Sequence, residues 1–444
     1  MPSEYNYRYL LVGGGMASDS AARGIRERDP VGSIGIVGAD KDAPVSRPDL
    51  SKSLWTDPEF TFEKVWLNTA EDTGATLHLA SRAIDLDRVS KSITADSGDV
   101  FHYEKLLLAT GGTPRRLDFP DDDRVIYYRT VDDYRRLRNW AGGDRHVVVI
   151  GGGFIGTEIA ASLIQNETAV TLIYSDETLG GSTFPSDLSA HLERKYRDAG
   201  VELIGNSRVE RGFATGDDLL IEIPSGDVIT ADAVVIGLGV TPEIELAESA
   251  GLTIGDGVIV DQTLQTSDPS IWAAGDIANY PDAILGQVRI EHVDNATEMG
   301  RQAGRNLAGA GEPYDHTPLF YSDLFDDGYE AVGRLRANLR MIEDWIEADG
   351  SGDRSGDGSG DGSGDGSGAG SNDGSADGSA VGSAHSSGAR KSGVVYYWDD
   401  YHPDSATGAV VGVLLWNMDG GSDEAREIIA RPPSDPNELI GRIR

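Results

Sequence analysis

The sequence of 444 residues contains no cysteine. Disulfides, thiolate metal sites and a Cys-x-x-Cys redox pair are therefore excluded, and no other metal site is expected. An enzyme built from this chain cannot pass electrons through a protein disulfide. No apolar run approaches the ~20 residues that a membrane-spanning helix needs. The segment before Leu10 lacks the basic and apolar regions of a signal peptide, so we expect a cytoplasmic protein without membrane insertion.

Lysine is scarce as well. Seven of the 38 basic residues are lysines, and 74 acidic residues bring the formal net charge to −36. A charge of this sign and size repels nucleic acid and anionic membranes. An acidic surface poor in lysine is typical of proteins that stay soluble in high salt, which favours a halophilic host. The alternative is an ordinary acidic protein with an acidic tract, and a stability curve against KCl separates the two.

Two strand–turn–helix–strand units can be recognised about 140 residues apart. Each begins with an apolar run that ends in three glycines and continues into a helix-like segment and a second apolar run. The first unit comprises residues 7–12, Gly13 to Gly15, residues 17–28 and residues 33–37. The second comprises residues 146–150, Gly151 to Gly153, residues 155–165 and residues 169–174. Two such units predict two doubly wound α/β domains.

The first unit carries the pattern Gly13-x-Gly15-x-x-Ser18. In such a motif the first glycine forms a tight turn, the second lets the backbone approach a pyrophosphate, and the third position needs a small residue. An acidic residue about 20 positions further on is expected to bind ribose hydroxyls, and Asp40 lies close to that position. The alternative is a glycine-rich turn without a ligand.

The second unit has the more complete pattern, Gly151-x-Gly153-x-x-Gly156, with Asp176 20 residues after Gly156. A carboxylate at this spacing accepts both ribose hydroxyls of an adenosine and repels a 2′-phosphate. The pattern therefore predicts an NADH site rather than an NADPH site.

Two further apolar runs indicate FAD at the first unit. Residues 106–111 end in Ala-Thr-Gly, with Thr110 and Gly111, and residues 271–276 end in Gly-Asp, with Asp276. A carboxylate after such a strand can accept hydroxyls of the ribityl chain. Two nucleotide folds together with these segments resemble the pyridine nucleotide–disulfide oxidoreductase superfamily, whose disulfide branch is excluded by the lack of cysteine.

Other segments resemble the apoptosis-inducing factor family, and ferredoxin and rubredoxin reductases share much of the first. They are Arg47-Pro-Asp-Leu-Ser-Lys-Ser-Leu-Trp55, Tyr103 to Arg115, Ile290-Glu-His292, Phe320 to Leu324, Gly328 to Gly333, residues 393–397 and residues 410–417. The sequence departs from the family at Asp49, where a proline is usual, at Tyr321, where a tryptophan is common, and at Ala39, where a glutamate is usual. The resemblance implies an α/β fold with two doubly wound nucleotide-binding domains and a C-terminal α+β domain.

The resemblance also implies roles for individual residues. Lys52 and Glu158 would meet near flavin N5, and Phe154 would cover the flavin face. Further FAD contacts are implied for Arg47 and Arg115 at the pyrophosphate and for Ala83, Glu291, His292 and Tyr321. Further NAD contacts are implied for Phe154, Ile155, Glu158 and Gly239. The alternatives are a core aromatic at Phe154, a structural histidine at position 292 and solvated charges at the arginines.

The expected domains are 1–128 with 253–317 for FAD, 129–252 for NAD, and 318–444 for the C-terminal domain. A Gly/Ser/Asp tract at about 349–392 interrupts the last of these. This tract has too few apolar side chains to form a core, so we predict disorder. A calcium-binding repeat is the alternative, but it would need regularly spaced apolar residues that the tract lacks. Strands are expected at 394–398 and 409–416, with a turn at 399–408 between them and a short helix at 424–430.

These features predict an FAD-dependent oxidoreductase that takes hydride from NADH. The electron acceptor, which cannot be a protein thiol, stays open between a ferredoxin or rubredoxin, a quinone and oxygen. The alternative is a redox-sensing protein that NADH reduces slowly and whose flavin state controls dimerisation or partner binding. A membrane-bound quinone reductase is disfavoured because no amphipathic C-terminal helix is evident. The oligomeric state stays open, with a homodimer as one option.

Overall fold

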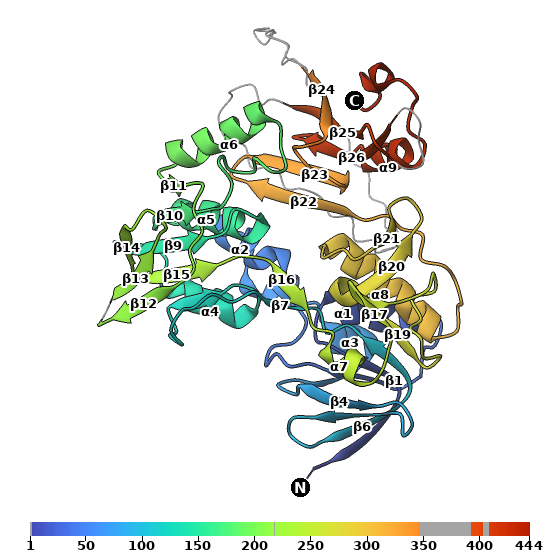
Figure 1. Ribbon diagram of the computed structural model, residues 1–444. Coiled ribbons are helices and arrows are strands. Elements are labelled where there is room, and N and C mark those ends of the chain that lie inside the picture. Colours follow the sequence, from blue (N-terminus) through green and yellow to red (C-terminus); the bar gives the residue numbers. More distant parts are fainter. Residues whose placement is uncertain (1, 217, 347–391, 403–407) are drawn as a thin grey trace, which may run out of the picture.

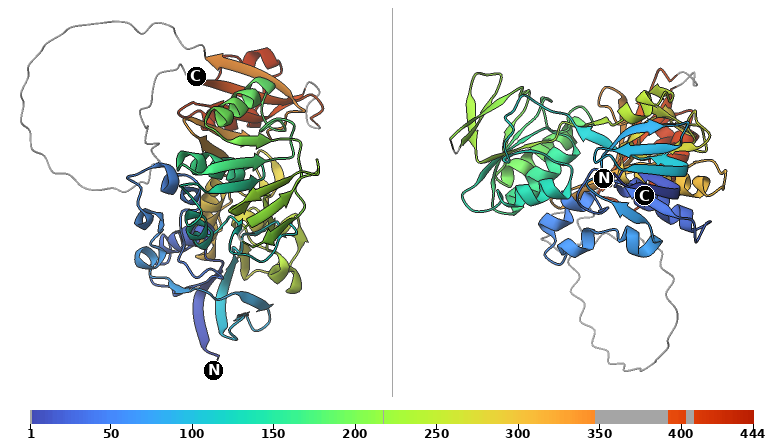
Figure 2. Two further views of the ribbon diagram at one scale, coloured as in Figure 1. Left: turned by 90° about the vertical axis from the view of Figure 1, so that its left-hand side faces the viewer. Right: turned by 90° about the horizontal axis from the view of Figure 1, so that it is seen from below.

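The computed structural model describes residues 2–216, 218–346, 392–402 and 408–444. Two parallel sheets lie side by side, and an antiparallel sheet that contains the C-terminal strands lies across one end of both (Figures 1 and 2). None of the helices in these residues is both long enough and apolar enough to cross a membrane.

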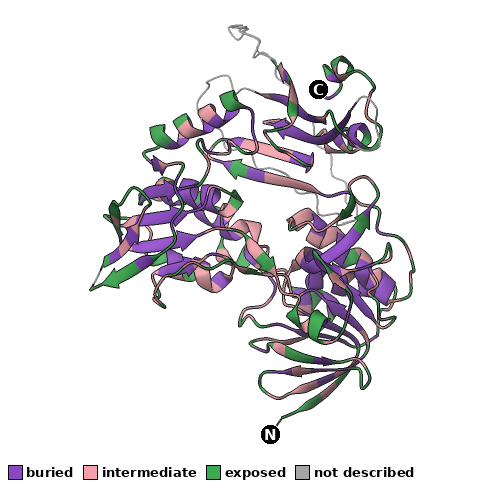
Figure 3. Cartoon of the chain, viewed as in Figure 1, coloured by how far each residue is buried: buried purple, intermediate pink, exposed green. Residues whose placement is uncertain are grey.

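The first parallel sheet has the strand order β3-β2-β1-β6, with β19 beside β6. The strands are β1 (Glu4–Val12), β2 (Ile34–Val37), β3 (Thr76–His78), β6 (Val100–Leu108) and β19 (Ile271–Ala273). Antiparallel strands β5 (Ser92–Ala95) and β4 (Ala83–Asp87) extend it. The C-terminal ends of β1 and β6 are continuous apolar runs in which every residue is buried, as expected for strands in the interior of a parallel sheet (Figure 3).

Helices α1 (Met16–Arg26) and α8 (Val293–Leu307) pack tightly together against this sheet. The contact depends on glycine. A Cβ atom at Gly304 would lie 2.0 Å from the carbonyl oxygen of Ala21, and one at Gly300 would lie 2.4 Å from that of Ala17. Helix α8, far along the chain, thereby closes the fold over the first glycine turn.

The second parallel sheet has the order β11-β10-β9-β15-β8. Its strands are β8 (Val125–Tyr127), β9 (His146–Ile150), β10 (Ala169–Ile173), β11 (Glu202–Ile204) and β15 (Ala233–Ile236), with helices α4 (Val131–Arg138), α5 (Phe154–Gln165) and α6 (Ser186–Asp198). A small antiparallel sheet, β12 (Gly212–Thr215), β13 (Asp218–Glu222) and β14 (Val228–Ala231), lies beside it. The chain passes between the two regions twice, through β7 (Gly112–Pro114) and β16 (Val240–Pro242), and these segments pair with each other.

Shorter elements complete these two regions. Helices α2 (Ser53–Thr56), α3 (Thr69–Thr73) and α7 (Glu245–Ser249) belong to connecting segments, as do η1 (Pro48–Leu50), η2 (Phe62–Val65) and η3 (Gly275–Ile277). A four-stranded sheet contains β17 (Ile254–Gly255), β18 (Gly257–Ile259), β20 (Ala278–Asp282) and β21 (Gly286–Val288).

The C-terminal sheet is antiparallel, with the order β22-β23-β26-β25-β24. Its strands are β22 (Leu319–Leu324), β23 (Asp327–Gly333), β24 (Arg340–Ile346), β25 (Ser392–Asp399) and β26 (Ala409–Trp416). Helix α9 (Ser422–Ala430) packs on one face of this sheet, and η4 (Pro436–Leu439) follows it. Helix α6 of the second region covers the other face, where Leu188 and Leu192 meet Leu414 and Trp416. The C-terminal sheet is therefore anchored on the second parallel sheet through α6.

The predicted α/β fold with two doubly wound sheets and a C-terminal α+β part is confirmed. Strand β1 begins at Glu4 rather than at residue 7 because its first residues pair with β6. Strand β25 is likewise longer than expected and includes Asp399, which we had assigned to a turn. The predicted disorder at about 349–392 falls almost wholly on residues 347–391, outside the described residues. These residues join β24 and β25, which are neighbours in the sheet.

Candidate flavin and nicotinamide sites

The first glycine turn has the geometry that its motif predicts. Gly13 follows β1 with a φ of +121°, and a Cβ there would lie 2.0 Å from the carbonyl oxygen of Ala109. Any side chain is therefore excluded at this position. Gly15 is the N-cap of α1, so the free N–H groups of that helix face the turn. The Oγ atom of Ser18 is buried and has no hydrogen-bond partner among the described residues.

A cavity of about 290 Å³ opens beside this turn. Residues from the loop after β2 form one wall, and the residues just before and within the start of α4 form the other. Asp40 and Arg47, both predicted from the sequence to contact FAD, line it. Its lining is Gly14, Ala39, Asp40, Lys41, Asp42, Ala43, Val45, Arg47, Arg129, Thr130, Val131 and Asp132.

Arg47 gives this cavity a buried guanidinium group with an unpaired donor. Its Nη1 atom is buried without a partner among the described residues, and its Nη2 atom lies 3.8 Å from Oδ2 of Asp40. Burial, and next the repulsion from the guanidinium of Arg129, lower the pKa of Arg47 to about 10. Two guanidinium groups and an orphaned donor fit a diphosphate, which is the anionic part of FAD.

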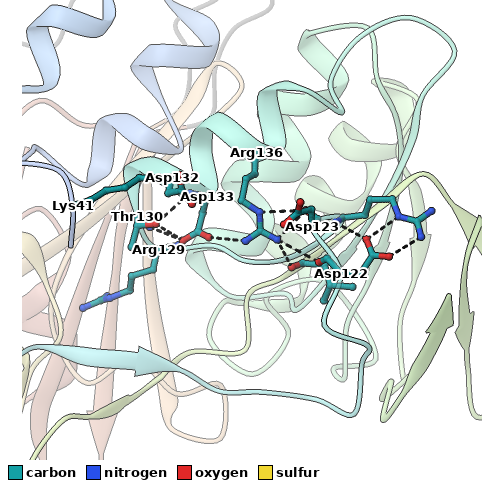
Figure 4. A network of polar contacts seen from close by, with 10 residues as sticks. Lys41, Asp122, Asp123, Arg129, Thr130, Asp132, Asp133 and Arg136 are labelled. Atoms are coloured by element: carbon teal, nitrogen blue, oxygen red, sulfur yellow. Dashed lines mark hydrogen bonds and ion pairs between the residues drawn. The ribbon is translucent and has the colours of Figure 1, made fainter. Parts of the chain in front are cut away.

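Arg129 is a cavity residue that the sequence analysis did not single out. Its Nη2 atom donates to Oδ2 of Asp276 at 2.8 Å. Its backbone is held by the capping box of α4: Asp133 accepts hydrogen bonds from the N–H groups of Arg129 and Thr130, and Thr130 Oγ1 accepts from the N–H of Asp133 (Figure 4). The capping-box pattern Thr-x-x-Asp was visible in the sequence and could have indicated an ordered helix start here.

Other residues predicted to contact FAD form two groups, Thr110 with Gly111, and Arg115 with Ala83. Gly111, with a φ of +73°, lies beside Arg129, because a Cβ on Gly111 would be 3.4 Å from Nη2. Thr110 donates from Oγ1 to the carbonyl of Glu243 at 2.6 Å, and Glu243 directly follows strand β16. Arg115 and Ala83, in contrast, are not part of the cavity lining. Arg115 is exposed and bonds through its N–H to the carbonyl of Gly239 at 3.0 Å, and Ala83 begins β4.

The second glycine turn repeats the geometry of the first. Gly151 has a φ of +123°, and a Cβ there would lie 2.3 Å from the carbonyl oxygen of Gly237. Gly153 is the N-cap of α5, with Phe154 and Ile155 in its first turn. A Cβ at Gly156 would lie 1.8 Å from the carbonyl oxygen of Gly151, so the third glycine is a packing requirement.

The predicted ribose carboxylate is also near this turn. Asp176 lies shortly after the end of β10, and its Oδ2 accepts a hydrogen bond from the N–H of Ser182 at 3.0 Å. Gly239, with a φ of +79°, has open space where a Cβ would stand. A position of this kind tolerates no ordinary side chain without backbone strain, although nothing crowds it.

Glu158 and Lys52 form a short ion pair between the two nucleotide regions. Glu158 lies in the second turn of α5 with a side chain that is 4 % exposed, and Lys52 belongs to the loop just before α2. Ser51 Oγ donates to Oε2 of Glu158 at 2.6 Å and Ser322 Oγ donates to Oε1 at 2.7 Å. The structure thus brings the predicted pair together. The sequence analysis did not connect either serine with it.

An aromatic cluster lies at the start of α5. The ring of Phe154 meets His292 at 5.9 Å and Phe320 at 5.7 Å between centroids, and His292 stacks on Phe320 at 4.6 Å. Phe154 is 38 % exposed, so one side of the cluster is open. Burial lowers the pKa of His292 to about 4 although the carboxylates of Asp276 and Asp294 oppose this, and the imidazole is therefore neutral at pH 7.

Two more predicted residues lie around this cluster. The ring of Tyr321 is 5.3 Å from Nζ of Lys52, so it covers the lysine of the ion pair. Glu291 accepts a hydrogen bond from Nη1 of Arg289 at 2.5 Å, and the same Arg289 nitrogen bonds to the carbonyl of Asp276. Glu291 therefore supports the segment that carries Asp276.

Two Rossmann-type glycine turns and a partly buried Lys52–Glu158 pair define the class of flavoproteins that use a pyridine nucleotide. The chain belongs to the pyridine nucleotide-disulphide oxidoreductase family, whose model matches residues 7–300, and residues 303–431 match the mitochondrion-associated C-terminal part of apoptosis-inducing factor. It is thus an FAD- and NAD-dependent oxidoreductase, as the sequence predicted.

Individual relatives agree with this family. The ferredoxin–NAD(+) reductase component of the anthranilate 1,2-dioxygenase system of Burkholderia cepacia is 34% identical over 74% of this chain and 82% of its own length. Apoptosis-inducing factor 1 of Dictyostelium discoideum is 28% identical over 99% of this chain and 82% of its own length. Putidaredoxin reductase, solved in covalent complex with putidaredoxin, has a TM-score of 0.79 at 27% identity, over 98% of this chain and 96% of its own.

Proposed function

We propose that this protein oxidises NADH and passes the electrons through FAD to an acceptor of the ferredoxin or rubredoxin type. The observation that carries the proposal is the Lys52–Glu158 pair beside the Phe154–His292–Phe320 cluster, between two glycine turns of the same geometry. When bound, FAD accepts a hydride from a nicotinamide and returns electrons to an acceptor.

In this proposal each residue has a defined task. Arg47 and Arg129 bind the diphosphate of FAD, and the N-terminus of α1 binds it from the other side. Asp176 accepts the ribose hydroxyls of NADH. Lys52 donates a hydrogen bond towards the flavin while Glu158 holds its ammonium group in place. Phe154 covers the flavin face. The neutral His292 stacks on Phe320 and so supports the ring of Phe154 without adding a charge.

Two observations support the proposed electron acceptor, namely the lack of cysteine and the reductases among the relatives of this chain. The chain has no cysteine with which to reduce a disulfide. A ferredoxin–NAD(+) reductase component is among its relatives, and putidaredoxin reductase shares its fold at 27% identity. A one-electron iron–sulfur acceptor is therefore favoured over a quinone or oxygen.

The deciding experiment is an absorption spectrum before and after anaerobic NADH. Bleaching of a yellow chromophore is expected, followed by reoxidation when a ferredoxin or rubredoxin is added. Lys52→Ala should slow flavin reduction or weaken FAD retention, whereas Lys64→Ala, an exposed lysine that bonds to a carbonyl in its own loop, should not. Colourless protein, or flavin that NADH does not reduce, would refute the proposal.

A redox-sensing role is the second candidate, favoured by the match of residues 303–431 to the C-terminal part of apoptosis-inducing factor. In that case NADH would reduce the flavin slowly and change dimerisation or partner binding. Turnover with an acceptor, together with sedimentation with and without NADH, separates the two roles. Fast turnover with an acceptor, together with a sedimenting mass that NADH does not change, would support the reductase role.

The acidic composition supports a further proposal, that the protein works in the cytoplasm of a halophilic host. The excess carboxylates that give the net charge of −36 repel one another unless salt screens them. Unfolding at low KCl and stability in molar KCl are expected. A fold equally stable at both salt concentrations would contradict the halophilic assignment.

A further inference from the structure

The carboxylate of Glu158 is held by residues far apart in the sequence. Helix α5 of the second region carries it, Ser51 and Lys52 reach it from the loop before α2, which packs on the core of the same region, and Ser322 reaches it from strand β22 of the C-terminal sheet. Oε1 accepts both the lysine and Ser322, while Oε2 accepts Ser51. A nearly buried carboxylate that accepts three donors is fixed in its orientation.

The loop that carries Ser51 and Lys52 is itself fastened to α5. Ser162, one turn after Glu158, donates from Oγ to the carbonyl of Ser51 at 2.8 Å. Trp55 donates from Nε1 to the carbonyl of Leu50 at 2.7 Å, and the hydroxyl of Tyr128 donates to the same carbonyl. This side of the pair therefore has several independent supports.

Ser322 is the contribution of the C-terminal sheet. It is 1% exposed and lies opposite Tyr329 in the β22–β23 ladder. The turn of that hairpin is held on α6, because Asp327 accepts hydrogen bonds from Lys195 Nζ at 2.5 Å and from His191 Nε2 at 2.8 Å. The polar contacts between the C-terminal sheet and the second region thus include those of Ser322 and Asp327.

We infer that Ser322 is a positioning residue that sets the geometry of the Lys52–Glu158 pair, so that the C-terminal sheet tunes the electrostatics at the flavin. Ser322 and Lys52 share one oxygen of Glu158, so the hydroxyl limits how far the carboxylate can turn towards the ammonium group. Without this donor, the carboxylate of Glu158 would be freer to turn, and the ammonium group of Lys52 would follow it in a different direction. This inference rests on the proposed function, in which Lys52 acts on bound FAD.

The test compares Ser322→Ala with Ser189→Ala. Ser189 is a buried serine on α6 whose Oγ has no hydrogen-bond partner within the described residues, so it controls for the loss of a buried hydroxyl. Flavin reduction by NADH, measured anaerobically by stopped flow, should be about tenfold slower in Ser322→Ala, since a bond to a charged group is lost. The control should match wild type, and Ser322→Thr, which keeps a hydroxyl, should recover most of the rate.

A second readout does not depend on turnover. The two-electron midpoint potential of the bound flavin, measured by equilibration with redox dyes, should change in Ser322→Ala and stay constant in Ser189→Ala. A wild-type rate and a wild-type potential in Ser322→Ala would overturn the inference. A lower rate with a lower unfolding temperature and no recovery in Ser322→Thr would overturn it too, since the residue would then be purely structural. Failure of wild type itself to be reduced by NADH would instead refute the proposed function.

Discussion

The Nη2 atom of Arg129 lies 2.8 Å from Oδ2 of Asp276. This pair connects the start of α4 in the second region with the segment after β19 in the first, across the cavity beside the first glycine turn. Arg129 neutralises Asp276, while Arg47 keeps a buried donor without a partner among the described residues. An anion in the cavity would therefore find a buried guanidinium donor available to bind it.

Loss of Arg129 should weaken FAD binding. In Arg129→Ala the attraction for the diphosphate disappears and Asp276 becomes an unpaired negative charge, so we expect the affinity of the apoprotein for FAD to fall about tenfold or more. Fluorescence titration of apoprotein with FAD measures this. Arg115→Ala is the matched control, because Arg115 is exposed and outside the cavity lining. A larger effect at Arg115 would instead support the diphosphate contact that the family resemblance implies for Arg115.

Nucleotide preference should depend on the charge of Asp176. Asp176→Asn removes the repulsion of a 2′-phosphate, and we expect the ratio of kcat/KM for NADPH to that for NADH to rise about tenfold. Steady-state assays with both nucleotides give this ratio. Glu177→Gln makes the same charge change one residue further on, at an exposed position, and should leave the ratio almost constant. Equal effects of both variants would argue against a direct contact at Asp176.

Acid should weaken the contact of Asp327 with α6, which holds the C-terminal sheet on the second region. Burial alone would raise the pKa of Asp327, but hydrogen bonds from His191, Lys195 and Asn417 outweigh it and lower the pKa to about 2. Because this folded-state pKa is below the unfolded value of 3.8, the stabilisation of about 2 kcal/mol is present above pH 4 and is lost as the pH falls to 2.

The corresponding variant is Lys195→Met. It leaves a buried carboxylate without its main cation and should cost about 3 kcal/mol of stability at neutral pH. Thermal unfolding should show this loss at pH 7 and a smaller one near pH 3, where Asp327 becomes protonated in the variant. Arg197→Met, an exposed position on the same helix, is the control. The same loss at both pH values would mean that packing rather than charge is responsible.

His292 should make the protein less stable in mild acid. Its folded-state pKa of about 4 is below the ordinary 6.5, so the unfolded chain binds more protons between these values. Stability is therefore complete above pH 6.5 and falls as the pH drops towards 4. In His292→Phe, which preserves an aromatic ring against Phe320, this part of the pH dependence should vanish. Unfolding temperatures between pH 8 and 5 compare the two proteins, and parallel curves would show that His292 does not titrate in this way.

Local motifs explain why the two nucleotide turns could be predicted. The close approach of the backbone at Gly13 and at Gly151 involves residues at the ends of adjacent strands, and a glycine pattern encodes it directly. Arg129 was not predicted because its proposed role depends on the cavity formed between two regions, whereas Arg115, for which the resemblance implied a diphosphate contact, lies on the exposed crossing segment. Ser51 and Ser322 lie within segments that resemble the family, but the resemblance did not connect either serine with Glu158.

The sequence by itself determined the chemistry that is excluded and the two glycine turns at which we propose that dinucleotides bind. The lack of cysteine rules out a dithiol, and glycines at set spacings require turns that only glycine allows. Only the tertiary structure decided how the Lys52–Glu158 pair, which the family resemblance implied, is supported. Ser322 reaches Glu158 across 164 residues, so this contact follows from how α5 and β22 pack together. Packing over such a separation depends on the whole core, and no local pattern records it.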